Sequence, residues 1–249
     1  MCLAVLAMKP AVITPYYQED EEILRRSYLS VKNQSVSAQH FYIGDGVLNP
    51  LIDTWSVIHL SLPKNSANNG NTPRCLGALL AVSLGYDPIF FLDADNYYLV
   101  NHIQDAICIK QANPCVDVVF SGRQILLDDG TIFYPAPEDR LRLFADTSTM
   151  CFFKSSFSAL WLWGVIPKKL SPICDRLIYE SIFSMGMSTA WTEKPSMVFE
   201  SHYKSHYQAA KKRPIYQCHD PDWNYLKKIL PSELSEFKAT TGLEINIQL

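Results

Sequence analysis

Two aspartates separated by a single alanine, Asp93 and Asp95, follow the wholly apolar residues 89–92. The apolar run predicts a buried central strand, and ligands usually bind at the carboxyl ends of strands in open α/β sheets. Residues two apart in an extended chain point the same way, so we expect both carboxylates to project together while the small Ala94 faces inward. Paired oxygen ligands suit Mg²⁺ or Mn²⁺, which water and phosphate oxygens commonly complete. The pattern therefore predicts a metal site that takes a nucleotide diphosphate.

The Asp-Ala-Asp tripeptide also has a less specific interpretation, in which both acids are solvated in a surface loop. The apolar residues directly before it argue against a free loop, because such a run is typical of a strand buried on both faces. We therefore favour metal binding.

The rest of the chain predicts the sheet that positions these acids. Short apolar runs alternate with helical stretches over the first half, which is typical of a mostly parallel sheet covered by helices. The expected strands there are residues 11–14, 40–44, 56–60, 89–92 and 117–121, and the expected helices are 19–32, 72–84 and 102–111. The second half predicts a hairpin of 124–127 and 131–134, strands near 149–153 and 196–200, a helix over 171–185 and two short C-terminal helices.

Composition limits the possible partners and compartment. The 249 residues, 48% hydrophobic, can bury a sizeable core, and a net charge of -3 gives no field that draws nucleic acid or an acidic membrane. Seven cysteines without a CxxC pair argue against a disulfide framework. Residues 1–8 lack the basic start of a signal peptide, and polar residues interrupt the apolar stretch 76–92. We expect a cytoplasmic protein with no transmembrane segment, and a peripheral position at the inner membrane surface stays open.

Four segments, in this order, resemble the nucleotide-binding half of family-2-like glycosyltransferases with the GT-A fold. They are residues 12–17 (VITPYY), 42–46 (YIGDG), 73–78 (PRCLGA) and 90–95 (FFLDAD). The resemblance covers about the first 125 residues well, the rest loosely, and is specific only as an ordered set. It implies a GT-A (Rossmann-like) domain over 1–215, with a nucleotide-binding half 1–125 and an acceptor-binding half 126–215, and a small helical extension over 216–249. The implied reaction moves a sugar from a nucleotide-diphosphate sugar, a UDP-sugar by expectation, to the hydroxyl of a saccharide or lipid-linked saccharide, with Mn²⁺ or Mg²⁺.

The same resemblance implies roles for single residues. The end of the first strand and the acid after the second strand would hold the base and the ribose, and Asp93 would face the ribose while Asp95 ligates the metal. Arg74 would lie beside the nucleotide, although a solvated helix arginine is an equally good interpretation. Gly44-Asp45-Gly46-Val47 stands where the family usually has aspartate-aspartate-glycine-serine. The expected nucleotide-binding residues are Thr14, Pro15, Tyr16, Asp45, Arg74, Asp93 and Ala94.

An inverting transfer needs a carboxylate that takes the proton of the acceptor while the metal neutralises the departing diphosphate. Asp175 matches the place of the acid that many inverting GT-A enzymes carry at a helix start, and apolar residues 173, 177, 178 and 182 would leave it on the open side of the helix. The helix dipole favours an aspartate there whatever the function. Glu138 and Asp139 compete for the role, but we expect them in a surface loop near the acceptor.

Two further segments have family-implied roles. Residues 147–150 resemble the segment that lines the acceptor and donor sugar, or form a plain polar loop. In the tail 201–213, His206 would be a third metal ligand with His202 in reserve, and the cations 211–213 would close over the phosphates; a solvated basic loop is the alternative. Large aromatics are more often core than sugar platforms, and we expect this of Trp161, Trp163 and Trp191.

Two rival functions remain at this level. A sugar-phosphate nucleotidyltransferase shares the nucleotide-binding sheet and the acidic metal ligands, but it would show a glycine-rich basic loop after the first strand, and residues 14–19 (TPYYQE) offer none. A nucleotide- or carbohydrate-binding module that lost the chemistry is the other rival.

Overall fold

The computed structural model describes residues 8–133, 144–215, 217–218 and 220–249. The strands are β1 (Ala11–Tyr16), β2 (Gln39–Gly44), β3 (Ile58–Ser61), β4 (Ile89–Phe91), β5 (Tyr97–Tyr98), β6 (Val118–Leu126), β7 (Ile132–Phe133), β8 (Met150–Phe152) and β9 (Thr189–Glu200). The α-helices are α1 (Glu21–Lys32), α2 (Asn71–Ser83), α3 (His102–Ala112), α4 (Cys174–Ser184), α5 (Lys204–Ala209) and α6 (Trp223–Thr241). The 3₁₀ segments are η1 (Ile52–Thr54), η3 (Thr147–Thr149), η4 (Lys154–Val165) and η5 (Lys168–Ile173).

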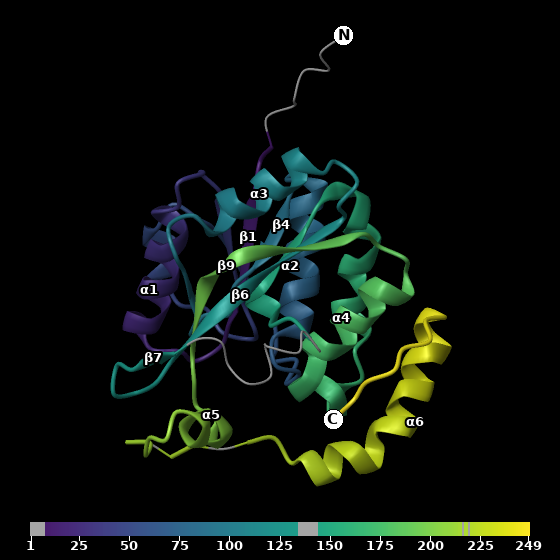
Figure 1. Ribbon diagram of the computed structural model, residues 1–249. Helices are drawn as coiled ribbons and strands as arrows, with labels where there is room; N and C mark the ends of the chain where they lie inside the picture. The colour runs from purple at the N-terminus through teal and green to yellow at the C-terminus, as the bar shows by residue number, and fades with distance from the viewer. Residues whose placement is uncertain (1–7, 134–143, 216, 219) are drawn as a thin grey trace.

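All strands join one sheet in the order β3-β2-β1-β4-β8-β6-β9-β5, with β7 added to β6 (Figure 1). The predicted α/β class is confirmed. Parallel pairing holds from β3 to β4, so the carboxyl ends of β1, β2, β3 and β4 meet at one edge. Beyond β4 the sheet is mixed, because β8 is antiparallel to both of its neighbours and β5 is antiparallel to β9. The expected parallel sheet is therefore confirmed in the nucleotide-binding half, and the other half combines the parallel pair of β6 and β9 with antiparallel pairs.

Successive residues of β1 face opposite layers of helices. Ala11 and Ile13 belong to a core shared with α2, η4 and α4, whereas Val12 packs into a second core with α1 and α3. Gly77 brings α2 close to β1, since a Cβ at this position would lie 2.6 Å from Cγ2 of Ile13. These two layers fix the strand ends that carry the predicted site.

Several element bounds differ from the sequence-based expectation. Residues 117–121 and 124–127 form one long strand, β6, whose irregularity at Gly122 lies opposite Pro195 of β9. Strand β9 begins at Thr189 and not near 196, and the two-residue β5 was not predicted. The predicted hairpin is confirmed where β7 pairs with β6.

The C-terminal helix α6 is longer than expected and continues through Pro231. Leu226 and Phe237 lie on either side of that proline and are buried in the same core as Ala11 of β1. Tertiary packing therefore overrides the helix-breaking tendency of proline. Helices α5 and α6 lie at the lower edge of the view in Figure 1. Within the part of the chain that the structure describes, no helix combines the length and the apolar character that crossing a bilayer requires.

Candidate functional site

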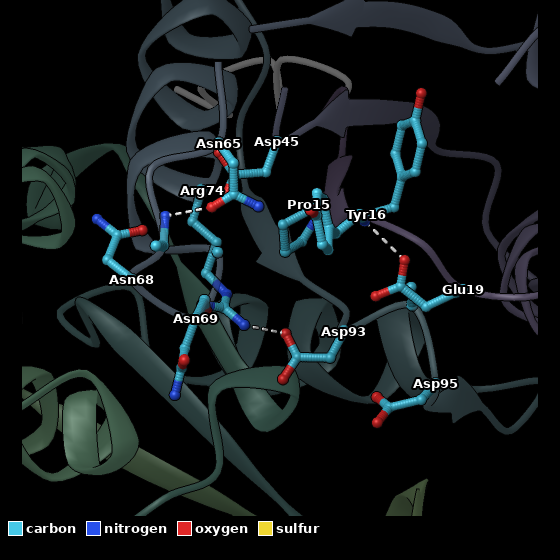
Figure 2. A pocket seen from close by; sticks show the side chains of 14 residues that line it. Pro15, Tyr16, Glu19, Asp45, Asn65, Asn68, Asn69, Arg74, Asp93 and Asp95 are labelled. Atoms are coloured by element: carbon cyan, nitrogen blue, oxygen red, sulfur yellow. Dashed lines mark hydrogen bonds and ion pairs between the residues drawn. The ribbon is translucent and has the colours of Figure 1, made fainter. Parts of the chain in front are cut away.

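A pocket of about 510 Å³ opens at the carboxyl ends of β1, β2 and β4 (Figure 2). It contains every expected nucleotide-binding residue except Thr14, and it also contains Asp95. The pocket therefore lies at the edge of the sheet where the sequence predicted a binding site. The lining residues are Pro15, Tyr16, Tyr17, Glu19, Asp45, Asn65, Ala67, Asn68, Asn69, Gly70, Arg74, Asp93, Ala94 and Asp95.

Thr14 and Tyr16 make their polar contacts inside the protein. Thr14 is fully buried, and its Oγ1 lies 2.8 Å from Nε2 of His40, away from the pocket. Tyr16 is a lining residue of the pocket, but its hydroxyl lies 2.7 Å from Nε2 of His59 and accepts a hydrogen bond of 3.0 Å from the Asn49 N–H. The structure therefore gives Thr14 a role in the sheet and leaves Pro15 and Tyr16 at the pocket.

The two aspartates lie in a turn that follows β4. The Asn96 N–H donates to the Asp93 carbonyl at 3.0 Å, so the expectation of a straight extension of the strand is wrong. The hydroxyl oxygen of Ser148 accepts hydrogen bonds from the Asp93 N–H at 3.0 Å and from Nδ2 of Asn96 at 3.1 Å, which holds the turn. Both carboxylates nevertheless line the pocket, and Asp93 lies between Arg74 and Asp95 in Figure 2. Ala94 is buried as expected.

Negative charge accumulates around Asp95. The pKa of its carboxyl is raised to about 7, first by burial and then by the carboxylates of Asp93, Glu19 and Asp146. A divalent cation between Asp93 and Asp95 would offset this repulsion. Mg²⁺ and Mn²⁺ accept one or two carboxylates together with water and phosphate oxygens, so the residues present fit such an ion.

Arg74 faces the pocket and is not the solvated helix arginine of the alternative interpretation. Arg74 is 5% exposed, and its guanidinium donates to the Asn69 carbonyl at 2.6 Å and forms an ion pair with Asp93. The ring of Trp163 lies 5.5 Å from the guanidinium carbon. Burial by itself lowers the pKa of Arg74, but Asp93, Cys174 and Asp146 together outweigh that effect and the pKa is raised. A permanent cation therefore stands beside the acid pair.

Asp45 tethers the asparagine-rich loop that follows β3. One of its carboxylate oxygens accepts hydrogen bonds from the Ser66 N–H and hydroxyl, both at 2.9 Å. Gly46 makes this possible, because a Cβ there would lie 2.1 Å from the backbone nitrogen of Asn65. The loop includes Ala67 at φ 49° and Asn69 at φ 53°, a strained conformation that is common at binding sites.

Sequence analysis assigned no role to this loop or to Glu19. Four asparagines between residues 65 and 71, directly after a strand of the parallel half, were the available signal.

Asp175 lines a second pocket of about 250 Å³. The apolar side of α4 is buried at Leu177, Ile178 and Ile182, which confirms the expected orientation of the helix. The pKa of the Asp175 carboxyl is raised to about 6, first by burial and then by the Asp146 carboxylate, while Arg176 opposes the shift. The residues around Asp175 in this pocket are Arg123, Phe144, Asp146, Pro172, Ile173, Arg176, Phe199, Tyr203, Ser205, His206, Asp220, Pro221 and Trp223.

A buried ion pair lies in the wall of the second pocket. Arg123 Nη1 lies 3.0 Å from Asp146 Oδ2, and the two residues are 5% and 9% exposed. Asp146 also accepts a hydrogen bond of 2.9 Å from the Ser148 N–H and so caps η3, which carries the serine that holds the Asp93–Asn96 turn. The Asp146 carboxylate raises the pKa of both Asp95 and Asp175. Neither member of this pair was predicted.

Replacing Asp146 with alanine is expected to lower the free energy of unfolding by about 3 kcal/mol, because Arg123 would keep its buried charge without this carboxylate. Urea unfolding measures the change. The control is Glu244→Ala, which removes an exposed partner of Lys238 and should cost less than about 0.5 kcal/mol. Equal small losses in both variants would contradict a structural role for the pair.

The structure does not bring His206 to Asp95. His206 is buried in α5, its Nδ1 lies 2.6 Å from the Ser201 hydroxyl oxygen, and it lines the second pocket with Asp175. The reserve ligand His202 is exposed. Among the residues with described placement, no three His, Cys, Asp or Glu side chains form a group that could hold a metal ion.

The three cations of the tail are exposed, and Lys212 pairs with Asp129 at 3.0 Å. None of them is among the described residues that line the first pocket. Their closure over phosphates stays a prediction.

The remaining predicted residues divide between core and surface. Trp163 is fully buried and Trp191 packs against the core, as expected, but Trp161 is 38% exposed. Residues 147–149 are buried and are not the plain polar loop of the alternative interpretation. Glu138 and Asp139 lie outside the described residues.

No protein-family model matches the chain, and no curated protein matches its sequence. Solved structures do match. TarS of S. aureus, residues 1–349 in complex with UDP-GlcNAc, superposes with a TM-score of 0.63 at 15% identity over 91% of this chain and 66% of that chain. The complex of TarS residues 1–349 with UDP superposes with a TM-score of 0.60 at 16% identity, over 94% of this chain and 74% of that chain. A longer TarS structure gives 0.61 at 15% identity over 93% of this chain and 44% of that chain, so the present chain spans less than half of it. The similarity confirms the GT-A fold predicted from the sequence.

Proposed function

We propose that the chain is a metal-dependent glycosyltransferase that moves a sugar from a UDP-sugar to a hydroxyl of a saccharide or lipid-linked saccharide, with inversion. One observation carries the proposal. The pocket at the strand ends combines a buried arginine, an acid pair and a tethered polar loop, in a fold shared with a protein solved with UDP and UDP-GlcNAc.

The chain's own residues divide the work of holding the donor. Arg74 offers a buried positive charge to the diphosphate, and the asparagine loop held by Asp45 offers amide groups to the nucleoside. Asp93 and Asp95 would hold the divalent cation, which when bound neutralises the charge that develops on the leaving diphosphate. Asp45 holds the loop, and Asn69 and Asp93 hold Arg74, through contacts within the protein, which lowers the cost of ordering these groups around the donor.

Asp175 would accept the proton of the acceptor in the second pocket. As the acceptor oxygen forms its bond to the anomeric carbon, its proton moves to the Asp175 carboxylate. The bond from that carbon to the diphosphate breaks, and its electron pair leaves with the diphosphate. A base with a pKa of about 6 is ionised at neutral pH and is a stronger base than an ordinary aspartate.

The pH profile of transfer should reveal this base. Because the pKa of Asp175 is raised to about 6, the carboxylate form is present above that pH and is lost below it. We expect kcat/KM at saturating Mn²⁺ to be level near pH 7.5 and to fall about tenfold per pH unit below pH 6. An Asp175→Asn variant should lack this inflection in its residual activity, and an inflection that persists in the variant would assign it to another group.

Donor hydrolysis tests the proposed function without a known acceptor. The protein would be incubated with UDP-GlcNAc and other UDP-sugars, with Mn²⁺ or with a chelator, and released UDP measured. Slow Mn²⁺-dependent release is the expected result. Binding of every donor without release would favour a binding module. Absence of both binding and release for all UDP-sugars would contradict the proposal.

A further inference from the structure

The turn that carries Asp95 is also held from the side away from the pocket. Arg26 of α1 donates from Nη2 to the backbone carbonyl of Asp95 at 2.6 Å. The same nitrogen donates to the Glu200 carboxylate, and the guanidinium carbon lies 5.2 Å from the ring centre of Tyr97. Arg26 therefore joins α1 to the residue that is expected to bind the metal.

Glu200, the last residue of β9, completes this arrangement. Its N–H donates to Oδ1 of Asn96 at 3.3 Å, while its carboxylate pairs with Arg26. Ser148 holds the other side of the turn through Asp93 and Asn96. The turn is thus fixed from three elements: Arg26 of α1 donates to the Asp95 carbonyl, Ser148 of η3 accepts from Asp93 and Asn96, and Glu200 of β9 donates to Asn96.

A fixed carbonyl matters at this position because Asp95 faces other acids. Asp93 and Glu19 line the same pocket, and without a bound cation their like charges push the Asp95 carboxylate toward water. If the Asp95 carbonyl had no hydrogen-bond donor, the turn could rotate and the Asp95 side chain could leave the pocket. The charge-assisted hydrogen bond from Arg26 to that carbonyl resists this rotation.

We propose that Arg26 is a positioning residue that keeps the Asp95 carboxylate directed into the pocket for the divalent cation. This inference rests on the proposed function. Arg26 does not line the pocket and would touch neither the donor nor the cation.

The test compares Arg26→Ala with its neighbour Arg25→Ala. Arg25 is exposed, pairs only with Glu21 at 2.9 Å among the described residues and makes no contact with the turn. Mn²⁺ affinity in the presence of UDP would be titrated by electron paramagnetic resonance, and UDP affinity measured calorimetrically with Mn²⁺ and with a chelator. For Arg26→Ala we expect Mn²⁺ affinity to fall about tenfold, the usual scale for a residue that supports a metal ligand. UDP affinity in chelator should stay unchanged, Arg25→Ala should equal the wild type, and Arg26→Lys should recover part of the loss.

Other results would refute either the positioning role of Arg26 or the proposed function. Unchanged Mn²⁺ affinity in Arg26→Ala, with a wild type that binds Mn²⁺ and UDP together, refutes the positioning role alone. An equal loss of UDP affinity with and without metal shows a general packing role and also refutes it. A wild type without metal-dependent UDP binding refutes the proposed function itself. If Arg26→Ala does not fold, Glu200→Gln weakens the same clamp and should lower Mn²⁺ affinity in the same direction, and no change there counts against the inference.

Discussion

Replacing Asp95 with alanine is expected to abolish Mn²⁺-dependent binding of UDP. The variant removes one of the two pocket carboxylates that we propose as metal ligands, so the loss should exceed the roughly 10- to 100-fold that follows removal of a supporting residue. Binding of UDP in chelator should not weaken, because the substitution also removes a negative charge from the neighbourhood of the diphosphate. Isothermal titration calorimetry with Mn²⁺ and with chelator separates these two effects.

The control for this experiment is Glu22→Ala, which removes an exposed acid from α1. It should bind UDP and Mn²⁺ as the wild type does. Unchanged affinity for UDP with Mn²⁺ in the Asp95 variant would refute the metal site, whatever the enzyme's activity.

Asp175→Asn is expected to bind the donor normally and to lose transfer by about 10²- to 10⁴-fold, the contribution of a general base. The amide keeps the size of the side chain and an oxygen that can accept the 2.8 Å hydrogen bond from the Arg176 N–H, so the start of α4 should be undisturbed. What it loses is the ability to accept a proton. Steady-state kinetics of transfer, together with donor affinity by calorimetry, measure the two quantities separately.

Glu180→Gln is the matched control, because Glu180 is a half-buried acid of the same helix outside the second pocket. Its turnover should stay close to that of the wild type. Near-normal turnover in Asp175→Asn would remove this residue from the mechanism.

The sequence predicted the first pocket well because its signals are local. Residues 89–92 are apolar without interruption, and the acids that follow them lie at the end of a buried strand, as expected. The roles of Asp45 and Arg74 were implied by the family resemblance, and the structure places Asp45 directly after a strand and Arg74 near the start of a helix in the parallel half. Such positions need only the order of elements and the common edge of parallel strands.

The second pocket was predicted only in part because distant segments form it. Arg123 is in the middle of a strand and Asp146 precedes a short 3₁₀ turn, and no spacing in the sequence indicates their ion pair. His206 was expected beside Asp95, but α5 turns its ring against Phe199 and the Ser201 hydroxyl. These contacts depend on tertiary packing, which residue patterns do not record.

The burial of Phe237 and Leu226 in the central core has a consequence for any attempt to shorten the protein. A chain cut after residue 215 would lose the helix that covers these apolar contacts and would expose side chains of η4 and η5 to water. The smallest fragment that keeps both pockets intact must therefore retain α6, even though the sequence presents it as an appendage. Trp223, at the first turn of that helix, would otherwise be missing from the wall beside Asp175.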